Sequence, residues 1–406
     1  MEIAIIGGGI AGLATAINLG LRGFSPTVYE RAPEIRELGV GITILPHAMR
    51  EHAALGIQDA LVAAGIVNVE SCFFNRFGQK IYGEPRGLAA GNANPEVGIH
   101  RGRLHLILLR RAQDVLWADR IVTGRAFTGL EQDAQGVTLH LTDTVTGRPL
   151  APLRADVVLG CDGVKSAVRR QFYPDEGFAF AGINTWRGVT RMKPFLTGAT
   201  YTRIGSIRSG KMVVYPIADF DDGSGDQLIN WVAEIQSPDA VMNDWNLRVE
   251  PADLPEVFDS WRFDWLDVPA MIAGASEIIE YPMVDRDPVD RWSFGRVTLI
   301  GDAAHPMYPR GSNGSAQAVI DARVVADRLA KLPPEEALGA YEAERLSVCN
   351  TIVVTNRTAP PDLINIRVEE LVGDRPFDNL DDFITQDELR ALSDGYKAVA
   401  YARAET

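Results

Sequence analysis

The sequence predicts an α/β protein in which a parallel sheet is assembled from distant segments and carries an inserted antiparallel sheet and a helical C-terminus. The pattern of residues 1–30 is typical of a strand, a glycine turn, a helix and a second strand. Residues 295–302 repeat the strand-and-turn pattern late in the chain. Between them, residues 183–283 are richer in tryptophan and contain short alternating strands. The parallel-sheet domain is therefore expected to be discontinuous.

The first thirty residues predict a dinucleotide-binding unit. A short strand leads into the turn Gly7 to Gly12, which opens a helix predicted over 10–22. Gly7 permits the tight turn, Gly9 lets the backbone approach a pyrophosphate, and Gly12 lets the helix pack on the strand. Glu30 ends the second strand, where its carboxylate can accept both hydroxyl groups of an adenosine ribose. The alternative is the same unit without a ligand.

The remaining elements follow from hydrophobic periodicity and turn signals. Apolar residues three and four apart predict further helices over 46–55, 101–118 and 315–332. Alternation predicts a hairpin over 121–141. In the inserted domain, strands are expected over 211–217 and 228–235, separated by a loop over 219–226, and a buried strand is expected over 155–160.

Composition excludes several classes of protein. The chain has 406 residues, 46% of them hydrophobic, and a net charge of −14, which argues against a nucleic-acid partner. No apolar stretch reaches the roughly 18 residues that a membrane span needs, so no membrane association and a cytoplasmic location are expected. The three cysteines form no CxxC pair and the six histidines lack metal-ligand spacing, so no metal is expected.

Three glycine-bearing segments resemble the single-component FAD-dependent aromatic hydroxylases, the flavoprotein monooxygenases. The matching segments are Gly7 to Gly12, residues 161–163 with Ser166 and Arg169, and residues 301–306 followed by 309–314. Further matches at 39–43, 100–102, 186–190 and 281–288 are similar to the phenazine-hydroxylase branch of this family, which acts in pyocyanin biosynthesis. Together these segments cover most of residues 1–350.

The resemblance implies a discontinuous Rossmann-like FAD-binding domain with an inserted antiparallel-sheet substrate domain and a helical C-terminus. The expected boundaries are 1–70, 98–180 and 286–345 for the FAD-binding domain, 71–97 and 181–285 for the substrate domain, and 346–406 for the C-terminal segment. No role can be assigned to residues 359–406 from the sequence.

The resemblance also implies a set of FAD-binding residues. Asp302 would bind a ribitol hydroxyl, or else cap a helix. The N–H groups of the loop from Gly311 to Gly314 would face the isoalloxazine ring, or else the loop is an ordinary helix start. Arg101 would neutralise pyrophosphate or remain a surface cation, and Asp162 would sense both nucleotides or close a tight turn. The full set is Gly7, Gly9, Ile10, Ala11, Gly12, Glu30, Arg31, Gly41, Ile42, Arg101, Asp162, Asp302, Gly311, Ser312, Asn313 and Gly314.

The implied reaction uses NADH or NADPH to reduce FAD and O2 to form a flavin hydroperoxide that hydroxylates an aromatic or N-heteroaromatic ring. Where the attacked carbon bears a carboxylate, the same transfer expels CO2. The site must exclude water, since a wet site releases hydrogen peroxide. One dinucleotide unit and no redox cysteine pair separate the chain from disulfide reductases. An FAD-dependent oxidase or dehydrogenase remains an alternative, and a flavin-binding regulatory module is a second.

Candidate substrate contacts lie in the inserted domain. Trp186, Tyr215, Trp231 and Met283 are expected to offer a flat apolar surface for an aromatic ring, although each could also be a core residue.

Three residues are candidates for catalysis. His47 could take a proton near neutral pH or bind a carboxylate, or else only start a helix. Tyr215 could orient a substrate hydroxyl, and Arg310 could pair with a substrate carboxylate. His305 is expected to be structural, and Arg187 could be either functional or structural. The expected partners are a small aromatic substrate, O2 and NAD(P)H, with the protein a monomer or homodimer.

Overall fold

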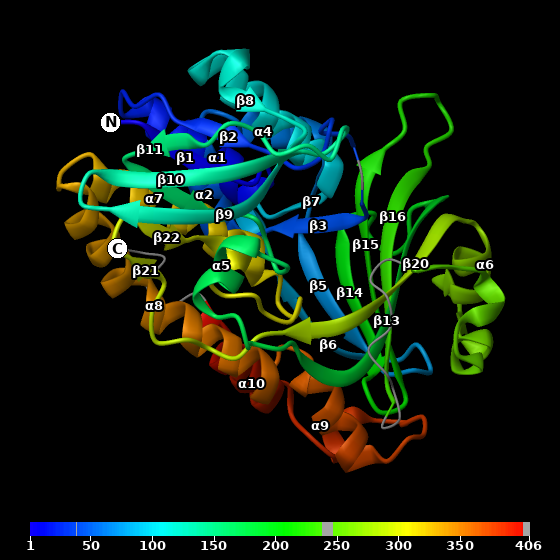
Figure 1. The fold of residues 1–406 in the computed structure, drawn as a ribbon. Helices are drawn as coiled ribbons and strands as arrows, with labels where there is room; N and C mark the ends of the chain where they lie inside the picture. Colours follow the sequence, from blue (N-terminus) through cyan, green and yellow to red (C-terminus); the bar gives the residue numbers. More distant parts are fainter. Residues whose placement is uncertain (38, 238–246, 401–406) are drawn as a thin grey trace.

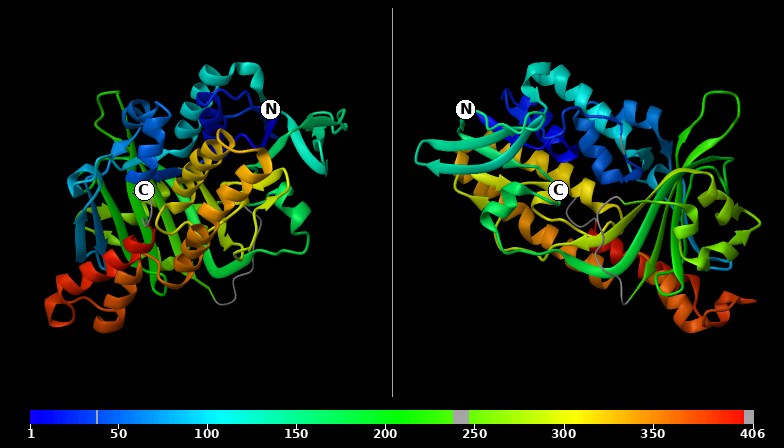
Figure 2. Two further views of the ribbon diagram at one scale, coloured as in Figure 1. Left: turned by 90° about the vertical axis from the view of Figure 1, so that its left-hand side faces the viewer. Right: turned by 45° about the vertical axis from the view of Figure 1, so that its right-hand side comes forward.

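The computed structural model describes residues 1–37, 39–237 and 247–400. An α/β region and a large antiparallel sheet lie side by side, and helices from the C-terminal part of the chain run along both (Figure 1). The right-hand view of Figure 2 shows the large sheet between the α/β region and the small helix α6, Val268–Ala273. The predicted α/β architecture is confirmed.

The six-stranded sheet of the α/β region collects strands from three parts of the chain. Its inner strands are parallel, because β1 pairs with both β12 and β2 in that sense and β12 pairs likewise with β22. The spatial order is β21 (Ser293–Phe294), β22 (Val297–Leu299), β12 (Val157–Gly160), β1 (Ile3–Ile6), β2 (Thr27–Tyr29) and β8 (Ile121–Val122). Every residue of β1, β12 and β22 is buried, which is typical of parallel strands covered on both faces.

Helices and a small sheet cover this parallel sheet. Helix α1 (Ile10–Leu21) packs against α4 (Arg101–Leu116) and α7 (Asn313–Leu329), and α2 (Pro46–Ala54) packs on α7. Helices α3 (Gln58–Ala64) and α5 (Ala167–Phe172) are shorter. The small sheet contains β9 (Arg125–Asp133), β10 (Gly136–Asp143) and β11 (Leu153–Ala155).

The large sheet has eight strands and joins the inserted segment to an earlier hairpin. In spatial order it contains β17 (Leu247–Val249), β20 (Ala275–Asp285), β13 (Ala179–Met192), β16 (Gln227–Gln236), β15 (Gly210–Asp219), β14 (Thr200–Ser206), β5 (Glu70–Phe74) and β6 (Lys80–Pro85). The pairing of β14 with β5 is parallel, and the other pairs are antiparallel.

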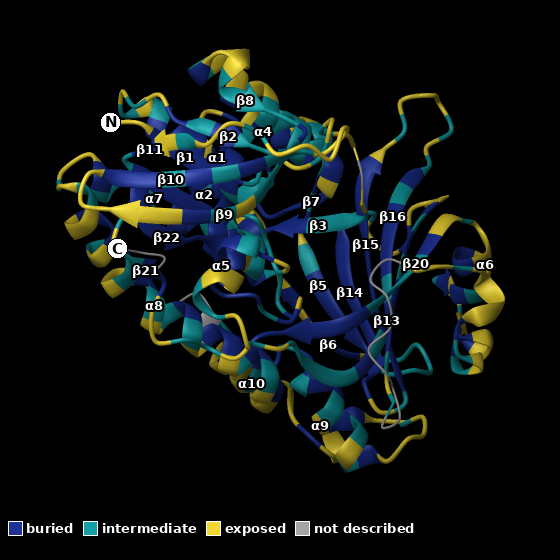
Figure 3. Cartoon of the chain, viewed as in Figure 1, coloured by how far each residue is buried: buried dark blue, intermediate teal, exposed yellow. Residues whose placement is uncertain are grey.

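The two faces of the large sheet have different neighbours. The outer face is covered by a cluster around Phe258, Trp261 and Met271, contributed by a short 3-10 helix (Glu256–Ser260) and by α6. The inner face meets a three-stranded sheet of β3 (Gly41–Ile44), β7 (Val97–His100) and β4 (Ile66–Val67), since β7 contacts β15. Both faces are therefore buried over most of β14, β15 and β16 (Figure 3).

The C-terminal helices connect the two regions. Helix α8 (Pro334–Thr358) packs on α7, while α9 (Leu363–Val372) contacts β14 and β5 (Figure 1). Helix α10 (Gln386–Ala400) contacts both α8 and α9. The predicted boundary at residue 345 falls inside α8, and residues 401–406 of the predicted segment lie outside the described part. Among the described helices, none has the length and apolar character needed to cross a bilayer.

Candidate active site

The glycine turn between β1 and α1 is shaped by close backbone contacts. Gly7 has φ +105, and a Cβ there would lie 2.5 Å from the carbonyl oxygen of Cys161. A Cβ on Gly12 would lie 1.9 Å from the Gly7 oxygen, so only glycine fits. At Gly9, in contrast, no atom lies within 4 Å of the Cβ position. The turn is closed against the sheet and open at Gly9, the side on which a pyrophosphate would approach.

Glu30 follows β2 and organises this turn. Its carboxylate accepts the backbone N–H of Gly8 at 2.7 Å and that of Ala32 at 2.7 Å. A carboxylate has about four acceptor positions, so Glu30 retains capacity for a ribose diol. Arg31, next along the chain, is exposed. The sequence did not point to His105 of α4, whose Nε2 lies 2.6 Å from the Gly8 carbonyl oxygen.

The Asp162 carboxylate binds mainly the first residues of helix α5 and the Ser166 hydroxyl that precedes them. Its carboxylate accepts hydrogen bonds from the Ser166 hydroxyl at 2.5 Å and from the backbone N–H of Ala167 at 2.6 Å and of Val168 at 3.1 Å. Burial raises the pKa of the Asp162 carboxyl despite these bonds. The Asp162 carboxylate therefore holds the start of α5 at this turn, and its contact with nucleotide cofactors stays a prediction.

Arg169 connects α5 to the segment around Asp302. Its guanidinium pairs with Glu176 at 2.5 Å and donates to the carbonyl oxygens of Ala303 and Ala304. The Asp302 side chain itself is exposed and has no hydrogen-bond partner among the described residues. A Cβ on Gly314 would lie 3.6 Å from its carboxylate. Asp302 and Gly314, at the end of the loop, therefore lie close together.

The loop before α7 contains two residues with positive φ and a buried acceptor oxygen that has no partner in the described residues. Gly311 and Ser312 have φ +73 and +58, the left-handed region that favours glycine. Asn313 is 1% exposed, and its Oδ1 is buried with no hydrogen-bond partner in the described part of the chain. Together with the open side of Gly9 and the unpaired Asp302 carboxylate, this acceptor fits FAD, which carries phosphate, hydroxyl and ring N–H groups.

Gly41 and Ile42 of β3 lie where the two regions meet. The Gly41 N–H donates to Asn230 Oδ1 of β16 at 2.7 Å, and a Cβ on Gly41 would lie 2.6 Å from the Asn230 side chain. Ile42 packs at the edge of the α/β core. The structure thus gives Gly41 an interdomain contact that the sequence did not reveal. Arg101 begins α4, is exposed and lies 3.8 Å from the Cβ position of Gly39.

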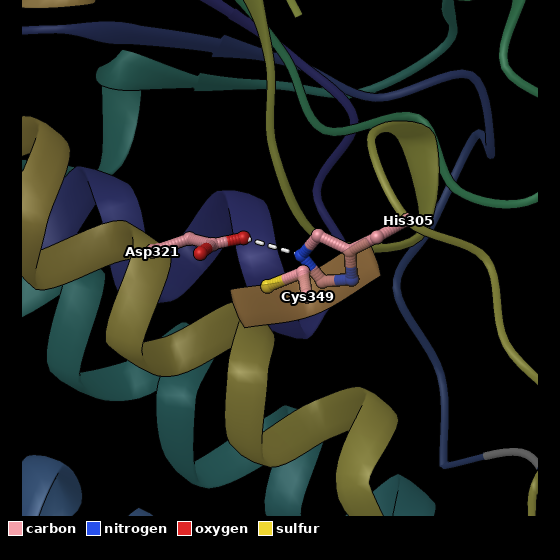
Figure 4. A group of neighbouring side chains, drawn as sticks. All are labelled: His305, Asp321 and Cys349. Atoms are coloured by element: carbon pink, nitrogen blue, oxygen red, sulfur yellow. Dashed lines mark hydrogen bonds and ion pairs between the residues drawn. The ribbon is translucent and has the colours of Figure 1, made fainter. Parts of the chain in front are cut away.

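His305 belongs to a buried network behind the glycine-bearing segment (Figure 4). Its Nε2 lies 2.6 Å from Asp321 Oδ2, which also accepts the Gly301 N–H at 3.2 Å, and Arg345 Nε donates to Asp321 Oδ1 at 2.7 Å. Although burial opposes its charging, Cys349 and Asp321 hold the pKa of His305 well above its usual value. These contacts satisfy both oxygens of the Asp321 carboxylate. His305, Asp321 and Arg345 therefore connect α7, α8 and the loop at 301–306.

The inner face of the large sheet carries stacked aromatic residues. Tyr215 and Tyr201 stack with centroids 4.9 Å apart and planes 16° from parallel. Burial and the neighbouring Tyr201 raise the pKa of the Tyr215 hydroxyl above its usual value. Met283 of β20 packs with Ile183 and with Tyr308, which lies just before residues 309–314, called here the cofactor loop. Tyr215 and Met283 thus face the α/β region, and their contact with a substrate stays a prediction.

Trp186 and Trp231 do not face the α/β region. Both belong to the outer cluster with Trp261, and the Trp231 indole N–H donates to the Thr190 hydroxyl at 3.0 Å. Successive side chains of a strand point to opposite faces, so the neighbours of these tryptophans, not the tryptophans themselves, face inward. The prediction that they line the same pocket as Tyr215 is wrong for this reason.

Arg187, next to Trp186, faces inward instead. Its guanidinium carbon lies 4.9 Å above the ring of Tyr281, and its charge also acts on Tyr215. The pKa of Tyr281 is raised by burial, and the charges of Arg187, Asp302 and Arg101 also act on this hydroxyl. Arg187 Nε is buried without a hydrogen-bond partner in the described part of the chain. Tyr281 and Arg187 therefore place an aromatic ring and a cation close to Asp302.

His47, one of the predicted catalytic residues, lies in an environment that disfavours its charged form. Burial, with smaller effects of Arg50 and Arg345, lowers the pKa of His47 to about 4. The expectation that His47 titrates near neutral pH is therefore wrong, because its charged form is desolvated.

Arg310 is 9% exposed and lies in a cluster of buried charges. Its charge lowers the pKa of Asp362, although burial opposes this, and Lys211 pairs with Asp362 at 3.2 Å and with Glu234 at 2.7 Å. With Arg310, this cluster holds two cations and two carboxylates. Asp362 thus compensates part of the Arg310 charge, while Arg310 Nε is buried without a hydrogen-bond partner in the described residues, so its contact with a substrate carboxylate stays a prediction.

Comparisons with known proteins identify the family of this chain. Residues 1–356 match the family described as FAD binding domain. The chain is 39% identical to the phenazine 1,6-dicarboxylic acid hydroxylase PhzS of Lysobacter antibioticus, over 88% of this chain and 89% of that protein. It is 30% identical to the 6-hydroxynicotinate 3-monooxygenase of Pseudomonas fluorescens, over 85% of this chain and 87% of that protein.

A solved structure shows the same fold. Klebsiella pneumoniae HpxO complexed with FAD and uric acid superposes with a TM-score of 0.77 at 22% identity, covering 100% of this chain and 96% of that one. The relatives are named hydroxylases and monooxygenases of aromatic compounds. The chain therefore belongs to the family of FAD-dependent aromatic hydroxylases, the single-component flavoprotein monooxygenases.

Proposed function

We propose that the protein hydroxylates an aromatic or N-heteroaromatic acid, with NADH or NADPH as reductant and O2 as oxidant. Where the attacked carbon carries the carboxylate, the same reaction releases CO2. Three relatives support this substrate class by name, since they act on phenazine 1,6-dicarboxylic acid, 3-amino-4-hydroxybenzoate and 6-hydroxynicotinate. The observation that carries the proposal is the inward Arg187 beside Tyr281 and Tyr215.

The α/β region would hold the cofactor. The turn from Gly7 to Gly12 would bind the pyrophosphate, Glu30 the ribose, and Asp302 with the loop at 311–314 the flavin end. When bound, FAD supplies the two-electron exchange with NAD(P)H and the reduction of O2. The remaining FAD contacts predicted from the sequence stay predictions.

The inner face of the large sheet would bind the substrate. The rings of Tyr215 and Tyr281 offer surfaces for an aromatic ring, and Met283 adds an adaptable apolar contact. Arg187 has no carboxylate within ion-pair distance in the described residues. Arg187 is half-buried and its Nε has no hydrogen-bond partner in the described residues, so a substrate carboxylate would satisfy this side chain through a bidentate pair.

Proton handling would fall to Tyr215 rather than His47. The raised pKa keeps the Tyr215 hydroxyl protonated at working pH, so it would donate a hydrogen bond to a substrate oxygen and orient the ring. His47, with a pKa of about 4, is neutral and a weak base. Arg310 would act indirectly, by holding the cofactor loop against the buried charges near Lys211.

The test pairs each aromatic acid with its carboxylate-free analogue. FAD-loaded protein is mixed with NADH or NADPH and with phenazine-1-carboxylate or phenazine, and with 6-hydroxynicotinate or 2-hydroxypyridine. Flavin reduction, O2 uptake and hydrogen peroxide are recorded. The proposal predicts that an acid accelerates flavin reduction at least tenfold and forms hydroxylated product, while its analogue does neither. Peroxide equal to NAD(P)H consumed with every compound would instead support the oxidase alternative.

A further inference from the structure

We propose that Tyr396 of α10 positions the cofactor loop, residues 309–314, so that the C-terminal segment forms part of the flavin site. The inference goes beyond the proposed function and depends on its placement of FAD against this loop. Sequence reasoning gave residues 359–406 no role, whereas the structure brings Tyr396 into contact with Asn313.

The Tyr396 hydroxyl connects three segments that are distant in the chain. It accepts a hydrogen bond from Asn313 Nδ2 at 3.0 Å and lies 3.2 Å from Asn356 Oδ1 and 3.4 Å from the Arg310 carbonyl oxygen. Its single proton is better placed for Asn356, the nearer acceptor. Asn356 in turn donates to the Tyr308 carbonyl oxygen at 3.3 Å. Tyr396, Asn313 and Asn356 are 8%, 1% and 0% exposed, so water does not compete.

The loop that Tyr396 contacts needs external support. Ser312 has φ +58, a strained conformation that a non-glycine residue keeps only where the surrounding structure holds it. A Cβ on Gly311 would lie 1.8 Å from the Tyr396 hydroxyl oxygen, so Tyr396 fills the space directly against the glycine. The hydroxyl and ring of Tyr396 therefore hold the loop in its left-handed form.

The same contact orients the Asn313 amide. Because Nδ2 donates to Tyr396, Oδ1 points the other way and is left as a buried acceptor without a partner in the described residues. Such an acceptor suits a ring N–H of a flavin. Loss of the Tyr396 hydroxyl would free the amide to rotate and weaken this preorganisation.

Helix α10 is itself anchored to the large sheet. Lys397 pairs with Glu84 of β6 at 2.7 Å, and the Ser393 hydroxyl donates to the same carboxylate at 2.8 Å. Leu389 packs with Ile81 and Tyr82 of β6. Helix α10 thus links the edge of the large sheet to the cofactor loop through Tyr396.

The test compares Tyr396→Phe with Tyr82→Phe. Both variants keep the ring and lose a hydroxyl where α10 meets the rest of the protein, but only Tyr396 touches the cofactor loop. FAD is titrated into the apoprotein, and the visible spectrum and midpoint potential of the bound flavin are recorded. We expect Tyr396→Phe to raise the Kd for FAD about 5- to 10-fold and to shift both spectrum and potential, while Tyr82→Phe leaves all three at wild-type values.

A second variant covers the case in which Tyr396→Phe does not fold. Asn356→Ala removes the acceptor of the Tyr396 hydroxyl and the donor to the Tyr308 carbonyl oxygen without changing a residue of α10 or of the loop, and the expected change in Kd has the same direction. In the double variant the two effects should be less than additive in free energy. Folded Tyr396→Phe or Asn356→Ala with the wild-type Kd and spectrum overturns this inference alone, whereas wild-type protein that binds no FAD overturns the proposed function as well.

Discussion

Glu30 Oε2 accepts the backbone N–H of Gly8 at 2.7 Å, so the acidic end of β2 and the glycine turn after β1 form one unit. Glu30→Gln keeps the shape of this side chain but removes its charge and one acceptor oxygen. We expect the Kd for FAD to rise about tenfold, or about 1.4 kcal/mol, as measured by fluorescence titration. Glu34→Gln, an exposed change nearby, is the control. Equal Kd values for both variants would contradict the role given to Glu30.

Two glycines of the same turn should respond differently to alanine. Gly12→Ala places a Cβ 1.9 Å from the Gly7 oxygen and should lower the free energy of unfolding by about 1–3 kcal/mol. Gly9→Ala meets no atom within 4 Å, so the apoprotein should unfold like wild type and yet bind FAD more weakly. Thermal unfolding of the apoproteins and FAD titration separate the effects. A Gly9→Ala variant with wild-type FAD affinity would show that no phosphate approaches this residue.

Arg187 should determine affinity for the acid substrate. We expect Arg187→Gln to raise the KM for an aromatic acid about 10- to 100-fold, the cost of a lost charge-assisted pair, while the Kd for FAD stays at the wild-type value. Arg191→Gln on the same strand is the control, since Arg191 pairs with Asp222 and Asp226 on the surface. An unchanged KM in Arg187→Gln, measured by steady-state turnover, would rule out the carboxylate contact.

His52 should make the protein sensitive to acid. Burial lowers its pKa to about 4, so between pH 6.5 and 4 the unfolded chain binds a proton that the native protein does not. Stability then falls as pH falls through this window, by about 1.4 kcal/mol per pKa unit and about 3 kcal/mol in all. His52→Leu should flatten the decline, measured by urea unfolding at each pH. The control is His140→Gln at a half-buried site. If stability falls as steeply with pH in His52→Leu as in this control, His52 is not responsible.

The sequence predicted the parts of the fold that depend on local chemistry. The helix predicted over 10–22 is α1, Ile10–Leu21, and the hairpin over 121–141 includes β9 and β10. The helix predicted from Ser315 begins two residues earlier, at Asn313. Periodicity and turn residues fix such elements because their determinants lie within a few positions of each other.

The sequence did not predict which face of the large sheet carries which residue. Nine of the ten residues of β15 are buried, so no alternation of polar and apolar residues marks the inner face. Trp186 and Trp231 were therefore assigned by residue type and lie on the outer face, while Arg187 faces inward. Asn230 and Tyr396 had no local signal, because their contacts with Gly41 and Asn313 join residues 189 and 83 positions apart.

Isotope incorporation during turnover tests the central claim most directly. Purified protein loaded with FAD is supplied with NAD(P)H, 18O2 and the aromatic acid that best accelerates flavin reduction, and the product is examined by mass spectrometry. The account predicts one 18O atom in each product molecule and about one NAD(P)H consumed per product. Product without 18O, or NAD(P)H consumption matched only by hydrogen peroxide, would contradict it.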